Sequence, residues 1–308
     1  MKIFITRPIP EKGIQMLAAK GYEVKVNEAA NDRPATKAEV IDGVRGADAL
    51  LSVLTEKITS EIIEAGLPAL KVIANYAVGF DNVDVAYAKK SNILVTNAPS
   101  DEVNEAVAEH TFALMLALAR RIVDTDRLVL HHKYHAWGPS LWLGTSLSGK
   151  VLGIVGPGRI GNAVGKHGES FGMKVIFCGP NDDIDTFLPR CDFVSLHVPL
   201  LDSTRHLINE DRLKKMKPTS YLVNTARGPI VDEQALARAL KEGWIRGAGL
   251  DVFENEPDID PGLLKLENVV LTPHTASATV EARTKMSEVA ATNIIEALEG
   301  RVPPNLVQ

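Results

Sequence analysis

Short hydrophobic runs alternate with helical periodicity along the whole chain. Runs of this length, bounded by polar and turn-forming residues, are typical of buried strands. A first series of predicted strands comprises Lys2–Thr6, Glu23–Val26, Ala49–Leu54, Val72–Ala74 and Ile93–Thr96. A second series comprises Val151–Val155, Lys174–Cys178, Phe193–Val198, Ser220–Asn224, Ala248–Val252 and Val269–Thr272. Strands that alternate with helices form parallel sheets with helices on both faces, so the two series predict two α/β domains.

The boundary between the two series is predicted near Pro99. Ser100 is a favourable N-cap, and the acids at 101 and 102 follow where the helix dipole favours negative charge. The later part of this helix, TFALMLALA at 111–119, is apolar nearly all round, which predicts burial between domains or between subunits. A final helix, Val280–Leu298, is expected to return to the first domain. We therefore predict one domain of residues 1–98 plus 282–308 and a second domain of residues 99–281.

Composition excludes several classes of partner. The chain has 308 residues, of which 45% are hydrophobic and 24% charged, and its net charge is −5 without a Lys/Arg block. This balance argues against a nucleic acid or an anionic membrane as the main partner, and the apolar run 112–119 is too short to span a bilayer. The two cysteines, Cys178 and Cys191, lack metal-type spacing. They fit a reducing compartment, and we expect a cytoplasmic protein without a metal site.

The sequence Gly156-Pro157-Gly158-Arg159-Ile160-Gly161 is a G-x-G-x-x-G pattern that follows a predicted strand and opens a predicted helix. In that context the glycines permit a tight turn, close approach of a pyrophosphate and close packing of helix on sheet. The free N–H groups at the start of the helix favour an anion. The pattern therefore predicts a Rossmann-type domain that binds NAD or NADP.

The adenosine end of this site departs from the usual pattern. An acid that binds the ribose is expected at the end of the next strand, where this chain has Gly179. A 2′-phosphate would require Arg or Lys, and none follows before Arg190, whereas Asp182 and Asp183 lie nearby. About a dozen residues separate this strand from the next, near the minimum for a crossover, so we expect the helix and the outer strand to be shortened here and the adenosine end of the site to be more open. The acids give a slight preference for NAD.

Three chemically active side chains follow three strands of the second series. Arg227 follows SYLVN, Glu256 lies beyond AGLDV, and His274 follows NVVLT. The carboxyl ends of parallel strands lie at one edge of the sheet, where open α/β sheets bind ligands. Arg227, Glu256 and His274 are therefore expected to converge near the dinucleotide turn.

With these residues in place, the chain resembles the D-isomer-specific 2-hydroxyacid dehydrogenases, most closely their glyoxylate/hydroxypyruvate reductase branch. The resemblance rests on GPGRIG at 156–161, LHVPL at 196–200, NTARGPIVDE at 224–233, GLDVFENEP at 249–257, LTPHTASAT at 271–279 and YAVGFDNVD at 76–84. It implies a Rossmann-type cofactor domain inserted in a flavodoxin-like substrate domain, both doubly wound. It also implies that Arg227, Glu256 and His274 are catalytic.

The resemblance assigns further residues to ligand contacts. Cofactor contacts are implied for Gly156, Gly158, Arg159, Ile160, Gly161, Gly179, His197, Val198, Pro199, Thr204, Thr225, Ala226 and Asp251. Substrate contacts are implied for Leu54, Val78, Gly79, Ser277 and, from a neighbouring subunit of a homodimer, Trp137. The Val78 and Gly79 contacts are backbone N–H groups that bind a carboxylate.

These residues predict a reduction of a small 2-keto acid, and the resemblance implies that the acid is glyoxylate or hydroxypyruvate and the product the D-2-hydroxy acid. Arg227 binds the carboxylate and the ketone oxygen. His274 supplies the proton, and Glu256 orients the imidazole and favours its protonated form. Three alternatives remain open: a 3-phosphoglycerate dehydrogenase, a phosphite-type dehydrogenase, and a non-catalytic protein that senses a dinucleotide. His131 and His135 form a possible metal pair if they lie on a helix, although no third ligand is evident.

Overall fold

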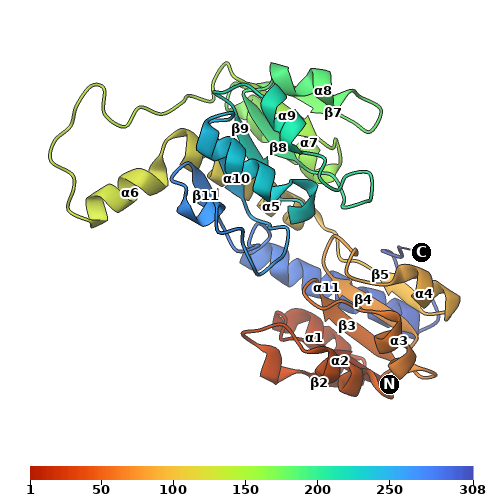
Figure 1. Ribbon diagram of the computed structural model, residues 1–308. Helices are drawn as coiled ribbons and strands as arrows, with labels where there is room; N and C mark the ends of the chain where they lie inside the picture. Colours follow the sequence, from red (N-terminus) through yellow and green to blue (C-terminus); the bar gives the residue numbers. More distant parts are fainter. Residues whose placement is uncertain (308) are drawn as a thin grey trace. The chain divides into compact units, whose positions relative to one another are not determined.

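The computed structural model describes residues 1–307, which form two compact units. Unit 1 comprises Met1–Val103 and the chain from Ala278 onward, and unit 2 comprises Asn104–Ser277. Each unit contains its own parallel sheet (Figure 1). The two α/β sheets predicted from the alternating pattern are therefore confirmed.

The sheet of unit 1 has the strand order β2-β1-β3-β4-β5, with all neighbours parallel. This order is that of flavodoxin-like folds, as expected. The strands are β1 (Lys2–Ile5), β2 (Glu23–Val26), β3 (Ala49–Val53), β4 (Val72–Tyr76) and β5 (Leu94–Thr96). The helices are α1 (Glu11–Ala19), α2 (Lys37–Val44), α3 (Ser60–Gly66), α4 (Val85–Lys90) and α11 (Val280–Leu298), with a 3₁₀ turn at Glu28–Ala30.

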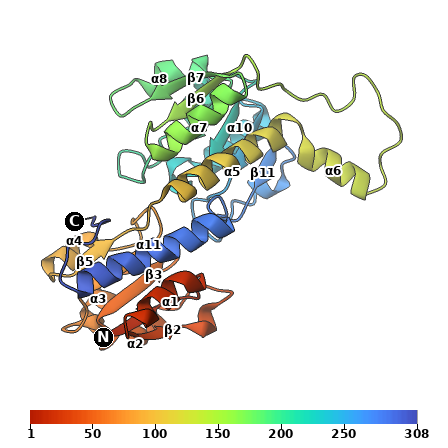
Figure 2. The ribbon, with the colours of Figure 1, turned by 180° about the vertical axis from the view of Figure 1, so that it is seen from behind.

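Helix α11 returns to the first unit, as the sequence predicted, and lies beside α1 and β4 (Figure 2). Its close approach to α1 depends on Gly13, because a Cβ at that position would lie 2.3 Å from the Ser287 carbonyl oxygen. The Ser287 hydroxyl accepts a hydrogen bond from the Gly13 N–H at 2.7 Å and donates one to the Pro10 carbonyl at 2.8 Å. The end of the chain is thereby fixed to its beginning.

The sheet of unit 2 has the order β11-β10-β9-β8-β6-β7 and is also parallel. Its strands are β6 (Val151–Val155), β7 (Lys174–Cys178), β8 (Phe193–Leu196), β9 (Tyr221–Asn224), β10 (Gly247–Leu250) and β11 (Val269–Leu271). The chain runs from β6 outward to β7 and then returns to the other side of β6 as β8. This reversal between β6 and β8 is where doubly wound sheets open a crevice for ligands.

Two groups of helices cover this sheet. Helices α5 (Asp101–Ala119) and α7 (Arg159–Ser170) share one hydrophobic core with β8 and β9. Helices α8 (Ile184–Phe187), α9 (Glu210–Lys215) and α10 (Glu233–Glu242) contribute to the other core, along with 3₁₀ turns at Leu188–Arg190, Gly228–Ile230 and Leu263–Lys265. The apolar helix α5, expected between domains or subunits, thus buries Phe112, Met115 and Leu118 against the sheet of its own unit.

Strand β7 lies at the edge of the sheet, and only the four-residue helix α8 and one 3₁₀ turn connect it to β8. The expected shortening of this crossover is therefore confirmed. Several strands end earlier than predicted. For example, β8 stops at Leu196 because its register with β6 ends there, at Val155.

A segment from α6 (Ile122–Leu130) to residue 146 extends away from the sheet of unit 2 (Figures 1 and 2). We call residues 122–146 the arm. Helix α6 has no buried residue and ends at Leu130. His131 and His135 therefore do not lie on a helix, and the geometry assumed for a metal pair was wrong. Within residues 1–307, no helix combines the length and the apolar character that crossing a membrane requires.

Candidate active site

Six strands of unit 2 place chemically active or glycine residues at one edge of the sheet. The residues that follow β6, β7, β8, β9, β10 and β11 include, in that order, Gly156, Gly179, His197, Arg227, Asp251 and His274. Parallel strands direct all their carboxyl ends to this edge. All six positions therefore lie at one edge of the sheet of unit 2, as the sequence predicted.

Each of the three glycines in the turn is required for a different physical reason. Gly156 has φ +99°, and a Cβ on it would lie 2.5 Å from the His197 carbonyl oxygen. A Cβ on Gly161 would lie 2.2 Å from the Gly156 carbonyl oxygen, so this glycine permits the helix to pack on the turn. A Cβ on Gly158 would meet no protein atom within 4 Å. Only Gly158 thus faces open space, as required where a pyrophosphate approaches the backbone.

Helix α7 begins at Arg159 with Gly158 as its N-cap, so the N–H groups of Arg159 and Ile160 belong to its first turn. No side chain caps this end. Free N–H groups and the helix dipole favour an anion at such a position. The turn therefore fits the pyrophosphate of a dinucleotide.

A carboxylate lies at the end of β7, although the residue that follows the strand is Gly179. The Asp182 Oδ2 atom accepts a hydrogen bond from the Gly179 N–H at 2.7 Å. It would lie 3.4 Å from a Cβ on Gly179, and that Cβ position is 3.8 Å from Pro157 Cγ in the glycine turn. The loop thus folds an acid back to the strand end. Asp183 instead caps α8, because its Oδ1 accepts the Asp185 N–H at 3.0 Å.

Glu256 and His274 are in direct contact. The His274 Nδ1 atom lies 2.8 Å from Glu256 Oε2. Glu256 Oε1 accepts the Phe253 N–H at 3.0 Å, which holds the carboxylate in place. The side chain of His274 is 23% exposed. An imidazole with one nitrogen fixed by a carboxylate and a partly exposed ring is suited to proton transfer.

Arg227 is positioned by the backbone around it. The Asn224 Nδ2 atom donates to the Arg227 carbonyl at 2.9 Å, and Arg227 Nη1 donates to the Ala226 carbonyl at 2.8 Å. The next residue, Gly228, packs so closely that a Cβ would lie 1.8 Å from the Phe253 carbonyl oxygen. The loop of Arg227 therefore lies against the loop that leads to Glu256. Gly228 and Asn224 were not predicted as site residues, although both belong to the motif NTARG.

Asp251 is fully buried, and its carboxylate stabilises the loop of His274 by hydrogen bonds. Its Oδ1 accepts from the Thr272 hydroxyl at 2.6 Å and the Thr275 N–H at 2.8 Å, and its Oδ2 accepts from the Ala276 N–H at 2.8 Å. Burial alone would raise the pKa of this carboxyl, but hydrogen bonds from His110, Thr272 and the two N–H groups outweigh it and lower the pKa. The predicted contact of Asp251 with a cofactor stays a prediction.

The segment after β8 contains other predicted cofactor contacts. The His197 Nε2 atom lies 2.8 Å from the Ser195 hydroxyl, and burial lowers the pKa of His197 to about 3, so this imidazole is neutral. The Thr204 hydroxyl donates to the Pro199 carbonyl at 2.7 Å and closes the loop that begins with Val198. The Thr225 hydroxyl is 3.0 Å from that of Thr111 and is largely buried.

The predicted substrate contacts are distributed over the chain. Leu54 follows β3, and Val78 and Gly79 follow β4, all three partly exposed at the carboxyl edge of the sheet of unit 1. Ser277 is the last residue of unit 2. Trp137 lies in the arm with 81% of its surface exposed.

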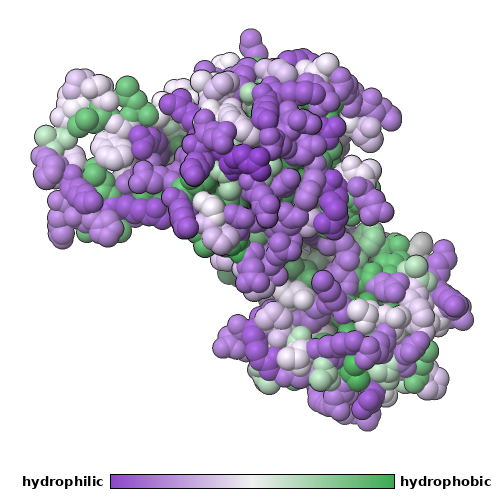
Figure 3. Space-filling model, viewed as in Figure 1, coloured by the Kyte–Doolittle hydropathy of each residue, from purple (hydrophilic) through white to green (hydrophobic). Residues whose placement is uncertain are grey.

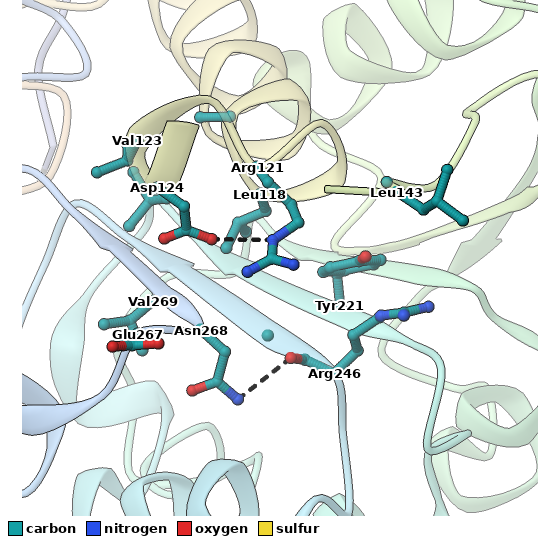
Figure 4. Close-up of a pocket in the computed structure, with 14 residues that line it drawn as sticks. Leu118, Arg121, Val123, Asp124, Leu143, Tyr221, Arg246, Glu267, Asn268 and Val269 are labelled. Carbon is teal, nitrogen blue, oxygen red and sulfur yellow. Dashed lines mark hydrogen bonds and ion pairs between the residues drawn. The ribbon is translucent and has the colours of Figure 1, made fainter. Parts of the chain in front are cut away.

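A cavity of about 290 Å³ lies at the opposite edge of the sheet of unit 2, where Tyr221, Gly247 and Val269 begin their strands (Figure 4). Arg121 in its wall is paired with Asp124 at 3.0 Å. None of the predicted site residues lines this cavity. In the part of the chain that the structure describes, no group of three His, Cys, Asp or Glu side chains is arranged to hold a metal ion.

The comparison with known proteins agrees with this geometry. Residues 112–276 match the family model of the D-isomer specific 2-hydroxyacid dehydrogenase, NAD binding domain. The chain is 48% identical to the glyoxylate reductase of Thermofilum pendens, over 99% of this chain and 94% of that protein. A crystal structure from Thermus thermophilus superimposes with a TM-score of 0.94 at 41% identity, with both chains covered completely.

A further solved structure carries ligands. It is the NADPH-dependent glyoxylate/hydroxypyruvate reductase of Sinorhizobium meliloti in complex with NADP and malonate, with a TM-score of 0.86 at 30% identity over 99% of this chain and 96% of that chain. The family model covers more than half of the chain, and the relatives match nearly all of it. The chain belongs to the D-isomer specific 2-hydroxyacid dehydrogenases and is an NAD(P)-dependent oxidoreductase.

Proposed function

We propose that this enzyme reduces glyoxylate to glycolate, or hydroxypyruvate to the corresponding D-2-hydroxy acid, with NADH or NADPH. The observation that carries the proposal is the 2.8 Å contact between His274 Nδ1 and Glu256 Oε2 at the edge that also holds the glycine turn. A reduced nicotinamide, when bound, supplies the hydride for C2 of the keto acid. The relative in Thermofilum pendens is named glyoxylate reductase, which supports the choice of substrate.

His274 donates the proton that the carbonyl oxygen gains, so the product is a neutral hydroxyl group. With Nδ1 directed at Glu256, the proton leaves from Nε2. The carboxylate stabilises the imidazolium before transfer and fixes the ring. The guanidinium of Arg227 binds the keto acid through two parallel hydrogen bonds and stabilises negative charge on the carbonyl oxygen in the transition state.

The remaining contacts follow the division of the chain. Unit 2 is proposed as the dinucleotide-binding domain and unit 1 as the substrate domain, with Leu54 and the N–H groups of Val78 and Gly79 toward the keto acid. In unit 2, Ser277 also contacts the keto acid. The proposed cofactor contacts are Gly156, Gly158, Arg159, Ile160, Gly161, Gly179, His197, Val198, Pro199, Thr204, Thr225, Ala226 and Asp251.

NADH is the proposed coenzyme, because the carboxylate of Asp182 lies beside the strand end where the adenosine ribose is expected. A carboxylate accepts hydrogen bonds from ribose hydroxyls and repels a 2′-phosphate. The nearest cation after β7, Arg190, forms part of a 3₁₀ turn at the far end of the crossover.

A homodimer is proposed from the arm. Eight large hydrophobic side chains there are at least 41% exposed: Ile122, Val129, Leu130, Tyr134, Trp137, Leu141, Trp142 and Leu143. Figure 3 shows apolar residues among polar ones on this projecting segment. Exposed apolar surface of this kind marks a protein interface, and a second copy of the chain presents the same surface. Trp137 is proposed to reach the partner's substrate site, and the enzyme is proposed to be cytoplasmic.

Steady-state kinetics with NADH and NADPH test the proposal. Glyoxylate and hydroxypyruvate are expected to be reduced with kcat/KM well above those for oxidation of 3-phosphoglycerate or phosphite. Activity confined to one of those two compounds would replace the proposed substrate. Tight binding of NADH without turnover of any 2-keto acid would favour a dinucleotide sensor.

A further inference from the structure

The loop that follows β4 in unit 1 is held through its carbonyl oxygens. The Ala77 carbonyl accepts a hydrogen bond from the Ala98 N–H at 2.8 Å. The next carbonyl, that of Val78, accepts one from Asn97 Nδ2 at 2.7 Å. Two consecutive carbonyls are thus bound by two consecutive residues of the segment after β5. In an extended strand consecutive carbonyls point to opposite sides, so the chain here is turned.

Peptide geometry converts this arrangement into a direction for the N–H groups. In a planar trans peptide the carbonyl of one residue and the N–H of the next point in opposite directions. The N–H groups of Val78 and Gly79 therefore both point away from Asn97 and Ala98. Within residues 1–307, neither N–H donates to a protein acceptor. Two consecutive N–H groups on one side form a concave site that suits an anion.

Asn97 is itself fixed at three points. In addition to its side-chain bond, its N–H donates to the Asn305 carbonyl at 3.2 Å, and its carbonyl accepts from Asn293 Nδ2 at 2.9 Å. Asn293 lies in α11 and is fully buried. Helix α11 and the C-terminal segment therefore set the position of the amide that holds the Val78 carbonyl.

The other end of the loop has an equivalent anchor. Asn75 Nδ2 donates to the Gly79 carbonyl at 2.9 Å and to Asn82 Oδ1 at 2.8 Å. Asn75 Oδ1 accepts from the Ser52 hydroxyl at 3.0 Å, and both of these side chains are fully buried. Buried, fully bonded networks of this kind are rigid. The loop is thus fixed in advance on both sides of the two N–H groups.

We propose that Asn97 is a positioning residue that, by binding the Val78 carbonyl, directs the Val78 and Gly79 N–H groups toward the substrate carboxylate. The inference rests on the proposed function, in which those N–H groups bind the keto acid. Asn97 itself does not touch the substrate. Its contribution is the preorganisation of two donors, which strengthens binding because no ordering remains to be done on association.

The test compares Asn97→Leu with Asn268→Leu. Both changes remove a side-chain amide that donates to backbone carbonyls, since Asn268 Nδ2 donates to Leu240 and Arg246 at 3.2 Å. Asn268 lies at the edge of the unit 2 sheet where the strands begin, opposite the edge that holds the glycine turn. For Asn97→Leu we expect KM for glyoxylate and the inhibition constant of oxamate to rise by about tenfold, equivalent to about 1.4 kcal/mol. KM for NADH should not change.

A structural role alone predicts a different pattern. Loss of folded enzyme would lower the melting temperature and the apparent kcat of both variants and would leave KM and oxamate inhibition unchanged, which would overturn the inference. Methyl glyoxylate lacks the carboxylate charge, so its KM should rise less in the Asn97 variant than the KM for glyoxylate does. If the wild type reduces no 2-keto acid, the proposed function fails. Calorimetry of oxamate binding to the two proteins then decides the inference, and equal affinities would refute it.

Discussion

His274 and Glu256 form an ion-pair geometry in which each partner is fixed by backbone contacts. His274 has φ +55°, a left-handed conformation that costs a non-glycine residue about 1 kcal/mol or more. Its N–H donates to the Asp251 carbonyl at 2.8 Å, which holds that conformation. Glu256 is held by the Phe253 N–H. The strain occurs at the proposed proton donor, where it serves to aim the ring.

Replacing His274 by Asn removes the proposed proton donor at nearly constant size. We expect kcat for glyoxylate reduction to fall by roughly 10²- to 10⁴-fold, the usual contribution of general acid catalysis. NADH binding, measured by fluorescence titration, should be retained. A variant with wild-type kcat would rule out His274 as the acid.

Glu256→Gln keeps the shape of the side chain and removes its charge. Because the Glu256 carboxylate holds the imidazole ring through Nδ1, the variant should orient His274 less well and kcat for glyoxylate reduction should fall, by less than in His274→Asn. KM for NADH should not change. The matched control is Glu254→Gln, which changes a carboxylate that contacts His206 and should leave kcat near the wild-type value.

The glycine turn predicts opposite results for two similar substitutions. Gly158→Ala adds a methyl group in open space, so the melting temperature should stay close to that of the wild type while KM for NADH rises by about tenfold or more. Gly161→Ala forces its Cβ against the Gly156 carbonyl and should destabilise unit 2 by roughly 1–3 kcal/mol. Calorimetric unfolding and KM together separate the two. The same loss of stability in both variants would contradict the assignment of Gly158 to the ligand side.

Local patterns were sufficient to predict the two sheets, helix α11 and the sheet edge at which Arg227 and His274 lie. Hydrophobic runs and strand order constrain these features strongly, because strands buried on both faces of a parallel sheet appear as short continuous apolar runs between helical segments. The contact between His274 and Glu256 followed from the family motif. The role of Gly228 was not predicted. Where two backbones far apart in sequence approach closely, the only sign in the sequence is a single glycine.

The strand end at Gly179 is a second feature that the sequence could predict only in part. The absence of an acid at that position was evident from the sequence, but the return of Asp182 onto the Gly179 N–H depends on loop geometry. Likewise, the amide contacts of Asn97 and Asn75 connect strands, a helix and the C-terminal segment. No periodicity encodes such long-range polar contacts.

Asp182→Asn tests coenzyme choice. The amide oxygen can still accept the Gly179 N–H, but the negative charge is lost. The wild type should have a lower KM for NADH than for NADPH. In the variant the ratio of KM for NADPH to KM for NADH should fall by about tenfold, chiefly because repulsion of the 2′-phosphate falls. Asp183→Asn, which removes the charge of the α8 cap, is the matched control. Equal ratios in the two variants would remove Asp182 from the ribose site.

The arm is expected to control assembly. Val129 and Leu130 are 58% and 67% exposed, and changing both to Asp places charge in an interface that should exclude it. Sedimentation velocity should show a dimer for the wild type and a monomer for the double variant. Val280, 80% exposed at the start of α11, offers a control, since Val280→Asp should remain dimeric. A wild-type monomer at micromolar concentration would refute the proposed dimer.

His197 should make the fold sensitive to moderate acid. Its pKa is lowered by burial to about 3, against about 6.5 in an unfolded chain. Because the unfolded state binds the proton first, stability should fall as pH drops below about 6.5, by at most about 1.4 kcal/mol per pH unit for this group, until the folded imidazole also titrates. His197→Gln removes the titrating group. The difference in free energy of unfolding between pH 7 and pH 5, measured by urea denaturation, should therefore be smaller in the variant than in the wild type. Parallel pH dependences in the two proteins would show that His197 is protonated as easily in the fold as in the unfolded chain.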